Sequence, residues 1–312
     1  MPAIDRKYSK SIIEAACRVA KAVKARALLA YVDAVDDLEQ LQACVKPPTE
    51  LICVIRDRKD RLRLPDAKVK SLLVPGFNLT RMGQIKMAAL MAFTQQWLTR
   101  DDVFVFLTGV AGQRLDTMMV MEVGLEYELF HSVDQPKLTE HIRRVVFQRA
   151  LNLALELAHE GREGKPVGTV FVIGDYREVR KHCHQSIINP FHGYPEKQRN
   201  ILDEGMKETI KEFSSIDGAF IIKGTGVIMS AGTTLRSTIP GDKLPQGLGA
   251  RHAAAQGITA VTRSIALTIS ESTGMVRIWR RGKLITEIEK APPSPVAMGT
   301  PRPLPPSDPV NS

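Results

Sequence analysis

The sequence is poor in aromatic residues and has no long apolar run. Aromatic side chains make up 5% of the 312 residues. No segment approaches the about 20 uncharged apolar residues that a membrane helix needs, and the most apolar stretch, residues 145–157, carries Gln148, Arg149, Asn152 and Glu156. The opening segment, MPAIDRKYSKS, lacks an apolar core before a cleavage site. We therefore expect neither a membrane association nor a secretory signal.

Cysteine is also scarce. The four cysteines, Cys17, Cys44, Cys53 and Cys183, show no paired spacing. This usage is typical of a reduced protein and predicts a cytoplasmic location. Histidines flank Cys183, but neither a CxxC nor an HxxxH pair accompanies them. Because a zinc site needs several converging ligands, the sequence favours exposed histidines at a helix end.

Charge, in contrast, is abundant and its balance is basic. Lys and Arg number 43 against 34 Asp and Glu, which gives a net charge of +9. A basic protein attracts polyanions in general, whether nucleotides, nucleic acid or an anionic membrane surface. The basic residues are spread along the chain, and a basic cluster interleaved with aromatic residues is absent. The net charge does not choose among these polyanions, but the absence of such a cluster argues against a nucleic-acid partner.

Helical and strand patterns alternate in the N-terminal part of the chain. Apolar residues at helical spacing predict helices over residues 12–23 and 79–98. The predicted strands, each a short apolar run bounded by charge or by Pro and Gly, are residues 27–31, 51–55, 69–74, 103–107 and 117–123. Strands that alternate with helices imply an α/β fold with a parallel sheet covered on both faces.

One segment of this part resembles the C-terminal domain of pyruvate kinase. The resemblance depends on the helix–strand order and on Val103-Phe-Val-Phe-Leu-Thr-Gly109-Val-Ala-Gly112, followed by Thr117-Met-Met-Val120. In pyruvate kinases the corresponding loop can hold a phosphorylated effector. A turn between two buried strands explains Gly109 and Gly112 as well, so we assign no binding role to them. The catalytic barrel of that enzyme has no counterpart here, which argues against the same metabolic activity.

A Gly- and Pro-bearing stretch, residues 160–166, is the predicted domain boundary. We predict a pyruvate-kinase-like α/β domain at residues 1–130 and a linking helix and boundary at residues 131–165. A second α/β domain with a mixed sheet follows at residues 166–290. The tail, residues 291–312, has eight prolines among 22 residues and is expected to be disordered.

The second domain also alternates strands and helices. The predicted strands are residues 168–175, 218–223, 226–230, 265–270 and 276–279, and the predicted helices are residues 138–159, 176–183, 200–213 and 250–262.

Three polar motifs lie at element boundaries in this domain. Asp217-Gly218-Ala219 places a carboxylate at the start of an apolar strand, where glycine permits close approach of a ligand. Gly249-Ala250-Arg251-His252 opens an Ala-rich helix, whose amino end and two polar side chains suit a phosphate group. Ser270-Glu271-Ser272-Thr273-Gly274 forms a polar turn directly after a buried strand. Taken singly, each is explained by a turn, a solvated side chain or a hairpin, but their orderly spacing favours one shared site.

Together these motifs resemble the signature set of the diadenylate cyclase domain. Supporting matches are Gly168-Thr-Val-Phe-Val-Ile-Gly-Asp175 and Gly232-Thr-Thr-Leu235. The run His184-Gln-Ser-Ile-Ile-Asn-Pro-Phe-His-Gly-Tyr194 resembles the archaeal-type branch, which also carries a pyruvate-kinase-like N-terminal domain. The resemblance implies that residues 166–290 form a nucleotidyltransferase that joins two ATP molecules into cyclic di-AMP and releases two pyrophosphates. It also implies a homo-oligomer whose active sites meet face to face.

The resemblance further implies roles for individual residues. Asp217, Arg251 and His252 are the expected catalytic residues, and Asp217 and Glu271 are the expected ligands of Mn²⁺ or Mg²⁺. The expected nucleotide-binding residues, which belong to the matched motifs, are Gly218, Ala219, Gly232, Thr233, Leu235, Gly249, Ala250, Ser270 and Glu271.

The helix start departs from the family pattern at two positions. Many members read Gly-Thr-Arg-His-Arg, whereas this chain has Ala250 and Ala253. One hydroxyl and one positive charge are therefore missing, unless Arg236, Lys243 or Arg263 supplies the charge. The departure leaves a second hypothesis open, a non-catalytic sensor of an adenine nucleotide or a cyclic dinucleotide on the same scaffold.

Overall fold

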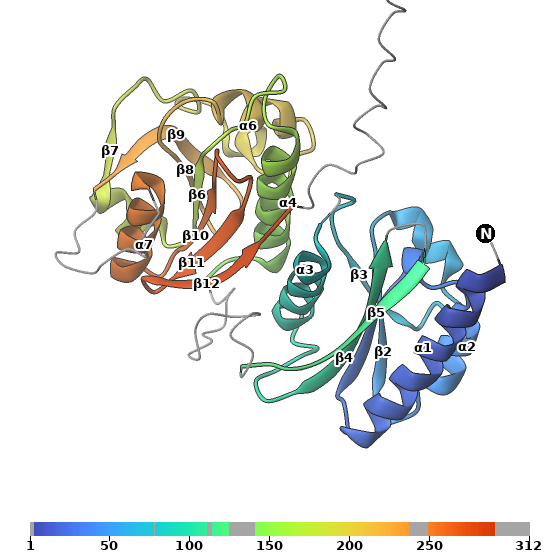
Figure 1. Cartoon of the computed structure of the whole chain (residues 1–312). Helices are drawn as coiled ribbons and strands as arrows, with labels where there is room; N and C mark the ends of the chain where they lie inside the picture. The colour runs from blue at the N-terminus through green and yellow to red at the C-terminus, as the bar shows by residue number, and fades with distance from the viewer. Residues whose placement is uncertain (1–2, 78, 111–113, 125–140, 237–248, 291–312) are drawn as a thin grey trace, which may run out of the picture.

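The computed structural model describes residues 3–77, 79–110, 114–124, 141–236 and 249–290. They form a five-stranded sheet and a seven-stranded sheet, each packed against helices (Figure 1). The α/β fold class with two sheets is therefore confirmed. None of the described helices has the length and apolar character needed to cross a membrane. The predicted disordered tail, residues 131–140 and Lys243 lie outside the described residues.

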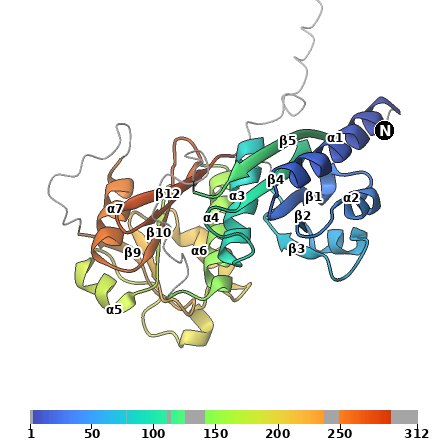
Figure 2. The same cartoon turned by 90° about the horizontal axis from the view of Figure 1, so that it is seen from below.

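The first sheet has the strand order β3-β2-β1-β4-β5. Its strands are β1 (Ala27–Tyr31), β2 (Glu50–Ile55), β3 (Lys70–Leu73), β4 (Val103–Val110) and β5 (Arg114–Glu122). Its helices are α1 (Ala3–Ala22), α2 (Leu38–Cys44) and α3 (Arg81–Thr94). Alternate residues of β1 face opposite ways, since Leu28 packs in the cluster that contains α1, and Leu29 packs in the cluster that contains α3. The sheet is thus covered on both faces, as Figure 2 shows.

The parallel prediction for this sheet is wrong at one strand. Strands β1 to β4 pair in parallel, but β5 pairs antiparallel with β4. The connection from Val110 to Arg114 is too short for the crossover that a parallel pair requires, so the chain must return antiparallel. Helix α2 was not anticipated by the sequence; the Asp37 carboxylate caps it by accepting a hydrogen bond from the Gln40 amide at 2.7 Å.

The cysteine prediction also needs a correction. Cys17 of α1 and Cys44 at the end of α2 form a disulfide, with their Cα atoms 6.0 Å apart. Packing of the two helices brings these cysteines together, although 27 positions separate them in the sequence. Sequence spacing alone could not show this pairing. Cys53 and Cys183 are free.

The second sheet has the strand order β12-β11-β10-β6-β8-β9-β7 and is mixed. Its strands are β6 (Val170–Ile173), β7 (Cys183–Gln185), β8 (Ala219–Ile222), β9 (Ile228–Leu235), β10 (Ile265–Ile269), β11 (Val276–Arg280) and β12 (Lys283–Ile288). Its helices are α4 (Arg144–Glu160), α5 (Tyr176–Val179), α6 (Met206–Phe213) and α7 (Ala250–Val261). Strands β6 and β8 run parallel, and the other pairs run antiparallel. Strands β7 and β12 were missed by the sequence patterns.

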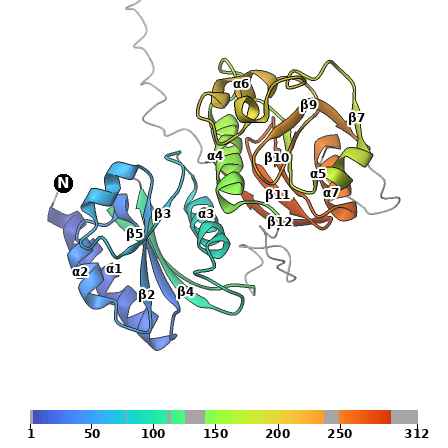
Figure 3. The ribbon, with the colours of Figure 1, turned by 180° about the vertical axis from the view of Figure 1, so that it is seen from behind.

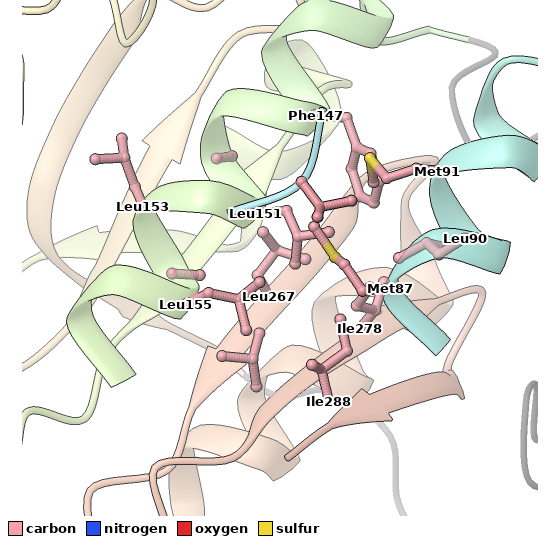
Figure 4. Packing of buried hydrophobic residues seen from close by; sticks show 14 of the residues in the cluster. Met87, Leu90, Met91, Phe147, Leu151, Leu153, Leu155, Leu267, Ile278 and Ile288 are labelled. Atoms are coloured by element: carbon pink, nitrogen blue, oxygen red, sulfur yellow. The ribbon is translucent and has the colours of Figure 1, made fainter. Parts of the chain in front are cut away.

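Helix α3 lies between the two sheets (Figures 1 and 3). It is buried over residues 83–92, which include Gly83, Met87 and Met91. Its side chains join α4 and the second sheet in a single buried cluster, which we name the shared core. The shared core includes Met87, Leu90 and Met91 of α3, Phe147 and Leu151 of α4, and Leu267, Ile278 and Ile288 of the second sheet. Figure 4 shows the α3 methionines pointing toward α4 and this sheet.

Helix α4 is part of the shared core as well as the predicted link between the domains. The helix packs on β10 and β11 and contributes Phe147, Leu151 and Leu155 to the shared core. The predicted boundary between the domains remains a prediction. Structurally, the residues on both sides of it are continuous with one core.

Candidate functional site

Strand direction brings the three polar motifs to one edge of the second sheet. Strand β10 runs antiparallel to β6, with Thr268 opposite Val170, and β6 runs parallel to β8, with Val170 opposite Ala219. The end of β10 therefore lies beside the starts of β6 and β8. Ser270 follows β10, and Asp217 shortly precedes β8. Both side chains consequently meet at the same edge.

A cavity of about 710 Å³ opens at this edge. Seven of the residues predicted from the sequence line it: Asp217, Gly249, Ala250, Arg251, His252, Ser270 and Glu271. Pro166, Ile269, Ser272, Thr273 and Arg277 complete the lining. The cavity is thus built from the three motifs and from strand β11.

The Arg251 guanidinium lies between two carboxylates. Its Nη2 is 3.4 Å from Asp217 Oδ1, and its Nη1 is 3.3 Å from Glu271 Oε2. The Asp217 side chain is 93% exposed and that of Glu271 is 59% exposed. Long ion pairs between exposed groups contribute little to folding. These three side chains are accordingly free to exchange partners with a charged ligand.

A further donor of Arg251 has no partner among the described residues. Its Nε is buried and makes no hydrogen bond to any residue that the structure describes. A buried unpaired N–H is costly unless a ligand or water completes it. A shift of the side chain that exposes this N–H to an acceptor, such as a phosphate oxygen, would therefore remove an energetic cost.

Gly218 fixes the position of Asp217 through the backbone. Its φ angle is +117°, and a Cβ there would lie 2.6 Å from the Gly232 carbonyl carbon. A residue with a side chain would be strained and would push β9 away. Gly218 and Gly232 thus let the Asp217 turn lie directly against β9.

The remaining predicted residues lie outside the cavity lining. Ala219 and Thr233 are buried partners across β8 and β9. The Thr233 hydroxyl donates to Gln185 Oε1 at 3.0 Å, and Leu235 pairs with Cys183 on β7. They support the strands behind Asp217; their predicted contact with nucleotide remains a prediction.

His252 lines the cavity but is largely buried against the sheet. It is 8% exposed, and its ring lies edge-on to Trp279 with the centroids 6.2 Å apart. Burial, and then the charges of Arg277 and Arg251, lower the pKa of His252 to about 4. The ring is neutral near pH 7, so its Nε2 accepts the hydrogen bond from Arg277 Nη1 at 3.0 Å. Arg251, and not His252, is therefore the positively charged side chain of the Gly249–His252 motif.

The amino end of α7 opens onto the cavity. Gly249 and Ala250 line the cavity, and Gly249 caps the helix without a side-chain hydrogen bond. The first amide groups of a helix lack intrahelical acceptors and favour anions. With Arg251 alongside, this helix end suits a phosphate group.

The Ser270 turn forms another part of the cavity wall. Ser270 N donates to Met275 O at 3.0 Å, and Gly274 N donates to Ser270 O at 2.8 Å. These bonds close the turn and leave Glu271 and Ser272 in the cavity lining. The motif is therefore a hairpin turn whose exposed side chains face the cavity.

The donor set at Asp217 and Glu271 fits a hard divalent cation. Among the described residues, no group of three or more His, Cys, Asp and Glu side chains forms a metal cluster. Mg²⁺ commonly uses one or two carboxylates, with water and substrate phosphates filling the remaining positions. Asp217 and Glu271 meet this requirement, because they are two exposed carboxylates that contact the same guanidinium.

Arg277 was missed by the sequence reading. It lies on β11 and lines the cavity, while its Nε donates to Glu287 Oε2 at 3.0 Å. A charged residue within the apolar run Val276-Arg277-Ile278-Trp279 was the available signal. By strand alternation it shares a face with Trp279, beneath α7.

Two family models match the chain over separate segments. Residues 156–284 match a family described as DisA bacterial checkpoint controller nucleotide-binding. Residues 9–130 match a family described as probable sensor domain DacZ_P. The first match includes every predicted site residue.

Two curated relatives are both named diadenylate cyclase. The protein from Methanocaldococcus jannaschii is 43% identical over 183 residues, which are 56% of this chain and 56% of that protein. The protein from Haloferax volcanii is 39% identical over 145 residues, which are 46% of this chain and 52% of that protein. The matches thus span about half the length of each relative.

A solved structure offers a distant likeness. A pyruvate kinase from Cryptosporidium parvum matches 36% of this chain and 22% of its own chain, with 16% sequence identity and a TM-score of 0.31. A TM-score this low supports no conclusion. The pyruvate-kinase resemblance of the N-terminal half therefore remains a prediction.

Proposed function

Because residues 156–284 belong to the diadenylate cyclase domain family, we propose that this chain joins two ATP molecules into cyclic di-AMP. The observation that carries the proposal is the arrangement of Arg251 between Asp217 and Glu271 in the cavity wall, beside the amino end of α7. This arrangement offers cationic and backbone donors for a triphosphate together with two carboxylates for a metal ion.

In the proposed reaction the 3′-hydroxyl of each ATP attacks the α-phosphorus of the other. Each attack forms one phosphodiester bond and breaks the bond between the α-phosphorus and the oxygen that bridges to the β-phosphate. Two pyrophosphates leave, and the hydroxyl protons pass to a nearby base. Phosphoryl-group transfer of this kind needs positioning and charge neutralisation more than covalent help from the protein.

Each side chain has a distinct part in this scheme. Asp217, which is almost fully exposed, accepts a hydrogen bond from the attacking hydroxyl. Arg251 turns from its carboxylate partners to the phosphate oxygens, and charge-assisted hydrogen bonds hold them. His252 stays neutral and positions Arg277. Ser270 and Ser272 offer hydroxyls to the nucleotide.

A metal ion belongs to the same proposal. Asp217 and Glu271 would hold Mn²⁺ or Mg²⁺, which supplies positive charge beside the α-phosphate when bound. We leave the choice between the two ions to experiment.

The proposed assembly is a pair of subunits with their cavities face to face. The product has two identical halves, and a two-fold axis presents the same patch from both subunits. The openness of the Asp217 and Glu271 side chains supports this arrangement, since a partner's nucleotide can approach them. We also propose a cytoplasmic location because ATP is supplied there; the Cys17–Cys44 disulfide removes the cysteine argument for it.

The decisive test is incubation of the purified full chain with ATP and Mn²⁺, followed by chromatography. Cyclic di-AMP and pyrophosphate in a 1:2 ratio are expected from the stoichiometry of the reaction. Binding of ATP without release of pyrophosphate would instead identify a non-catalytic sensor, the alternative raised by Ala250 and Ala253.

A further inference from the structure

We propose that Arg277 binds the β- and γ-phosphates of the nucleotide and so supplies the second cation of the cavity. The inference rests on the proposed function, because it deepens the assignment of the same site. Among the described residues that line the cavity, Arg251 and Arg277 are the two carrying permanent positive charge. Two carboxylates, Asp217 and Glu271, already face Arg251. A triphosphate carries several negative charges, and a second cation in the cavity would neutralise more of them.

The guanidinium of Arg277 is held in place before a ligand arrives. Glu287 accepts from its Nε at 3.0 Å, and the His252 ring accepts from its Nη1 at 3.0 Å. The side chain is only 13% exposed. A guanidinium has five N–H donors, and no hydrogen bond joins Nη2 to any described residue. Arg277 therefore meets the cavity as a pre-oriented donor with little conformational entropy left to lose.

The positions of the two carboxylates indicate which phosphates each arginine would bind. Asp217 and Glu271 mark the reacting centre, where the α-phosphate and the metal ion would lie, and Arg251 contacts both of them. Arg277 projects from β11 and contacts neither one. It is thus placed for the part of the triphosphate that leaves as pyrophosphate.

Of the basic residues considered from sequence, the two that the structure describes do not take this place. Arg263 lines a separate hollow with Asp175 and Glu178, which shares no lining residue with the cavity. Arg236 follows β9, and its amide donates to His182 O at 2.8 Å. Arg277 is accordingly the described residue whose contacts fit the missing charge.

The test compares two ligands by calorimetry with the full chain. AMP has only the α-phosphate, and α,β-methylene-ATP has all three but cannot release pyrophosphate. We expect Arg277→Met to weaken α,β-methylene-ATP binding about tenfold or more, the scale of a hydrogen bond to a charged group. AMP binding should change less than about twofold. Arg263→Met is the matched control and should leave both affinities unchanged.

A purely structural role predicts a different pattern. In that case Arg277→Met weakens both ligands by the same factor, or neither, and either result overturns the inference. Glu287→Gln separates the two roles further, since it loosens the support but keeps the guanidinium. It should retain tight α,β-methylene-ATP binding; a loss as large as that of Arg277→Met counts against the proposal. Should Arg277→Met fail to fold, Arg277→Lys must still lower the affinity ratio of the two ligands.

Turnover of ATP by the wild-type chain is assayed in parallel. Tight binding of α,β-methylene-ATP without any cyclic di-AMP would end the proposed function, while the Arg277 comparison stays readable from binding. Product formation by the wild type, together with unchanged ligand ratios for Arg277→Met, would end this inference alone.

Discussion

Arg251 and His252 are neighbours in the sequence and line the same cavity, but their side chains make different contacts. Arg251 extends to the carboxylates at the cavity, whereas His252 is buried against Trp279. Successive residues on a helix point in directions about 100° apart, so one can face a cavity while the next faces the sheet. The pair therefore combines a ligand-facing cation with a buried support for Arg277.

The first prediction concerns the carboxylate at the start of β8. Asp217→Asn should lower cyclic di-AMP synthesis by ~10²-fold or more, because an amide neither accepts a proton nor ligates a metal ion comparably. The fold should persist, since the Asp217 side chain is 93% exposed. Product chromatography and a thermal melt measure the two effects. Asp203→Asn, an exposed change in the same domain that can still accept from Gly205 N, is the matched control.

The second prediction concerns pH. The pKa of His252 is about 4 in the folded protein, below the ordinary 6.5, because of burial and then the charges of Arg277 and Arg251. The unfolded chain therefore binds a proton between pH 6.5 and 4 that the folded chain does not. The contribution of His252 to the free energy of unfolding is therefore constant above pH 6.5. It becomes less favourable as the pH falls from 6.5 to 4, and it levels off below pH 4. The total is on the order of 3 kcal/mol.

Urea unfolding from pH 7.5 to 4 checks this dependence. His252→Gln removes the titrating group, so its stability should vary less with pH than that of the wild type across this window. Identical pH profiles for the two proteins would contradict the assignment.

At the residue scale, the sequence indicates candidate site residues best where a motif is local. Asp217, Arg251 and Glu271 could be named because each lies in a short polar motif, and the structure brings them together. Their roles are still to be tested. The neutrality of His252 could not be read from the motif, because it arises from Trp279 and Arg277, which are distant in sequence.

At the scale of secondary structure, α3 has a fixed distance from β12. A Cβ on Gly83 would lie 2.7 Å from the Glu289 carbonyl oxygen. The helix can approach the end of β12 this closely only because position 83 has no side chain. This contact is one of the places where the two halves of the chain meet.

The third prediction follows from this contact. Gly83→Ala should lower the free energy of unfolding by ~1–3 kcal/mol through overpacking, despite the better helix propensity of alanine. The matched control is Gly76→Ala, where the nearest atom to the added Cβ is 4.0 Å away. Urea unfolding of both variants measures the difference. Equal stabilities for the two would show that the Glu289 contact can relax without cost.

Element prediction worked best for strongly patterned segments. The strand at Ala27–Tyr31 was predicted with its observed bounds, and the helices now seen as α3, α4 and α7 were expected. Strand β7 is only three residues long, which is too short to show a period. Strand β12 begins after a turn at Arg281 and Gly282 that the apolar pattern does not mark.

At the scale of the whole molecule, the shared core connects the segment matched as a probable sensor domain to the nucleotide-binding segment. The side chains of Met87 and Met91 point from α3 toward the second sheet and α4 (Figure 4). Strand β10, which carries Leu267 in this core, ends at the cavity. The shared core could not be predicted from the sequence, because helical periodicity shows that a face is apolar but not what covers it.

The fourth prediction is that both halves unfold together. The chain has two tryptophans, Trp97 beside the first sheet and Trp279 in the second. In Trp97→Phe fluorescence reports the second sheet, and in Trp279→Phe it reports the first. Within each variant the fluorescence and far-UV circular dichroism midpoints should coincide. Two resolved transitions would show that the shared core does not couple the halves.

The packing of α3 has a practical consequence for anyone who divides this chain. A fragment beginning near residue 141 would present the apolar sides of Phe147, Leu151 and Ile288 to water, and such surfaces promote self-association. A loss of activity in that fragment could then result from self-association as readily as from the removal of the N-terminal half. An experiment on how residues 9–130 affect residues 156–284 therefore calls for point changes on α3, with the whole chain kept intact.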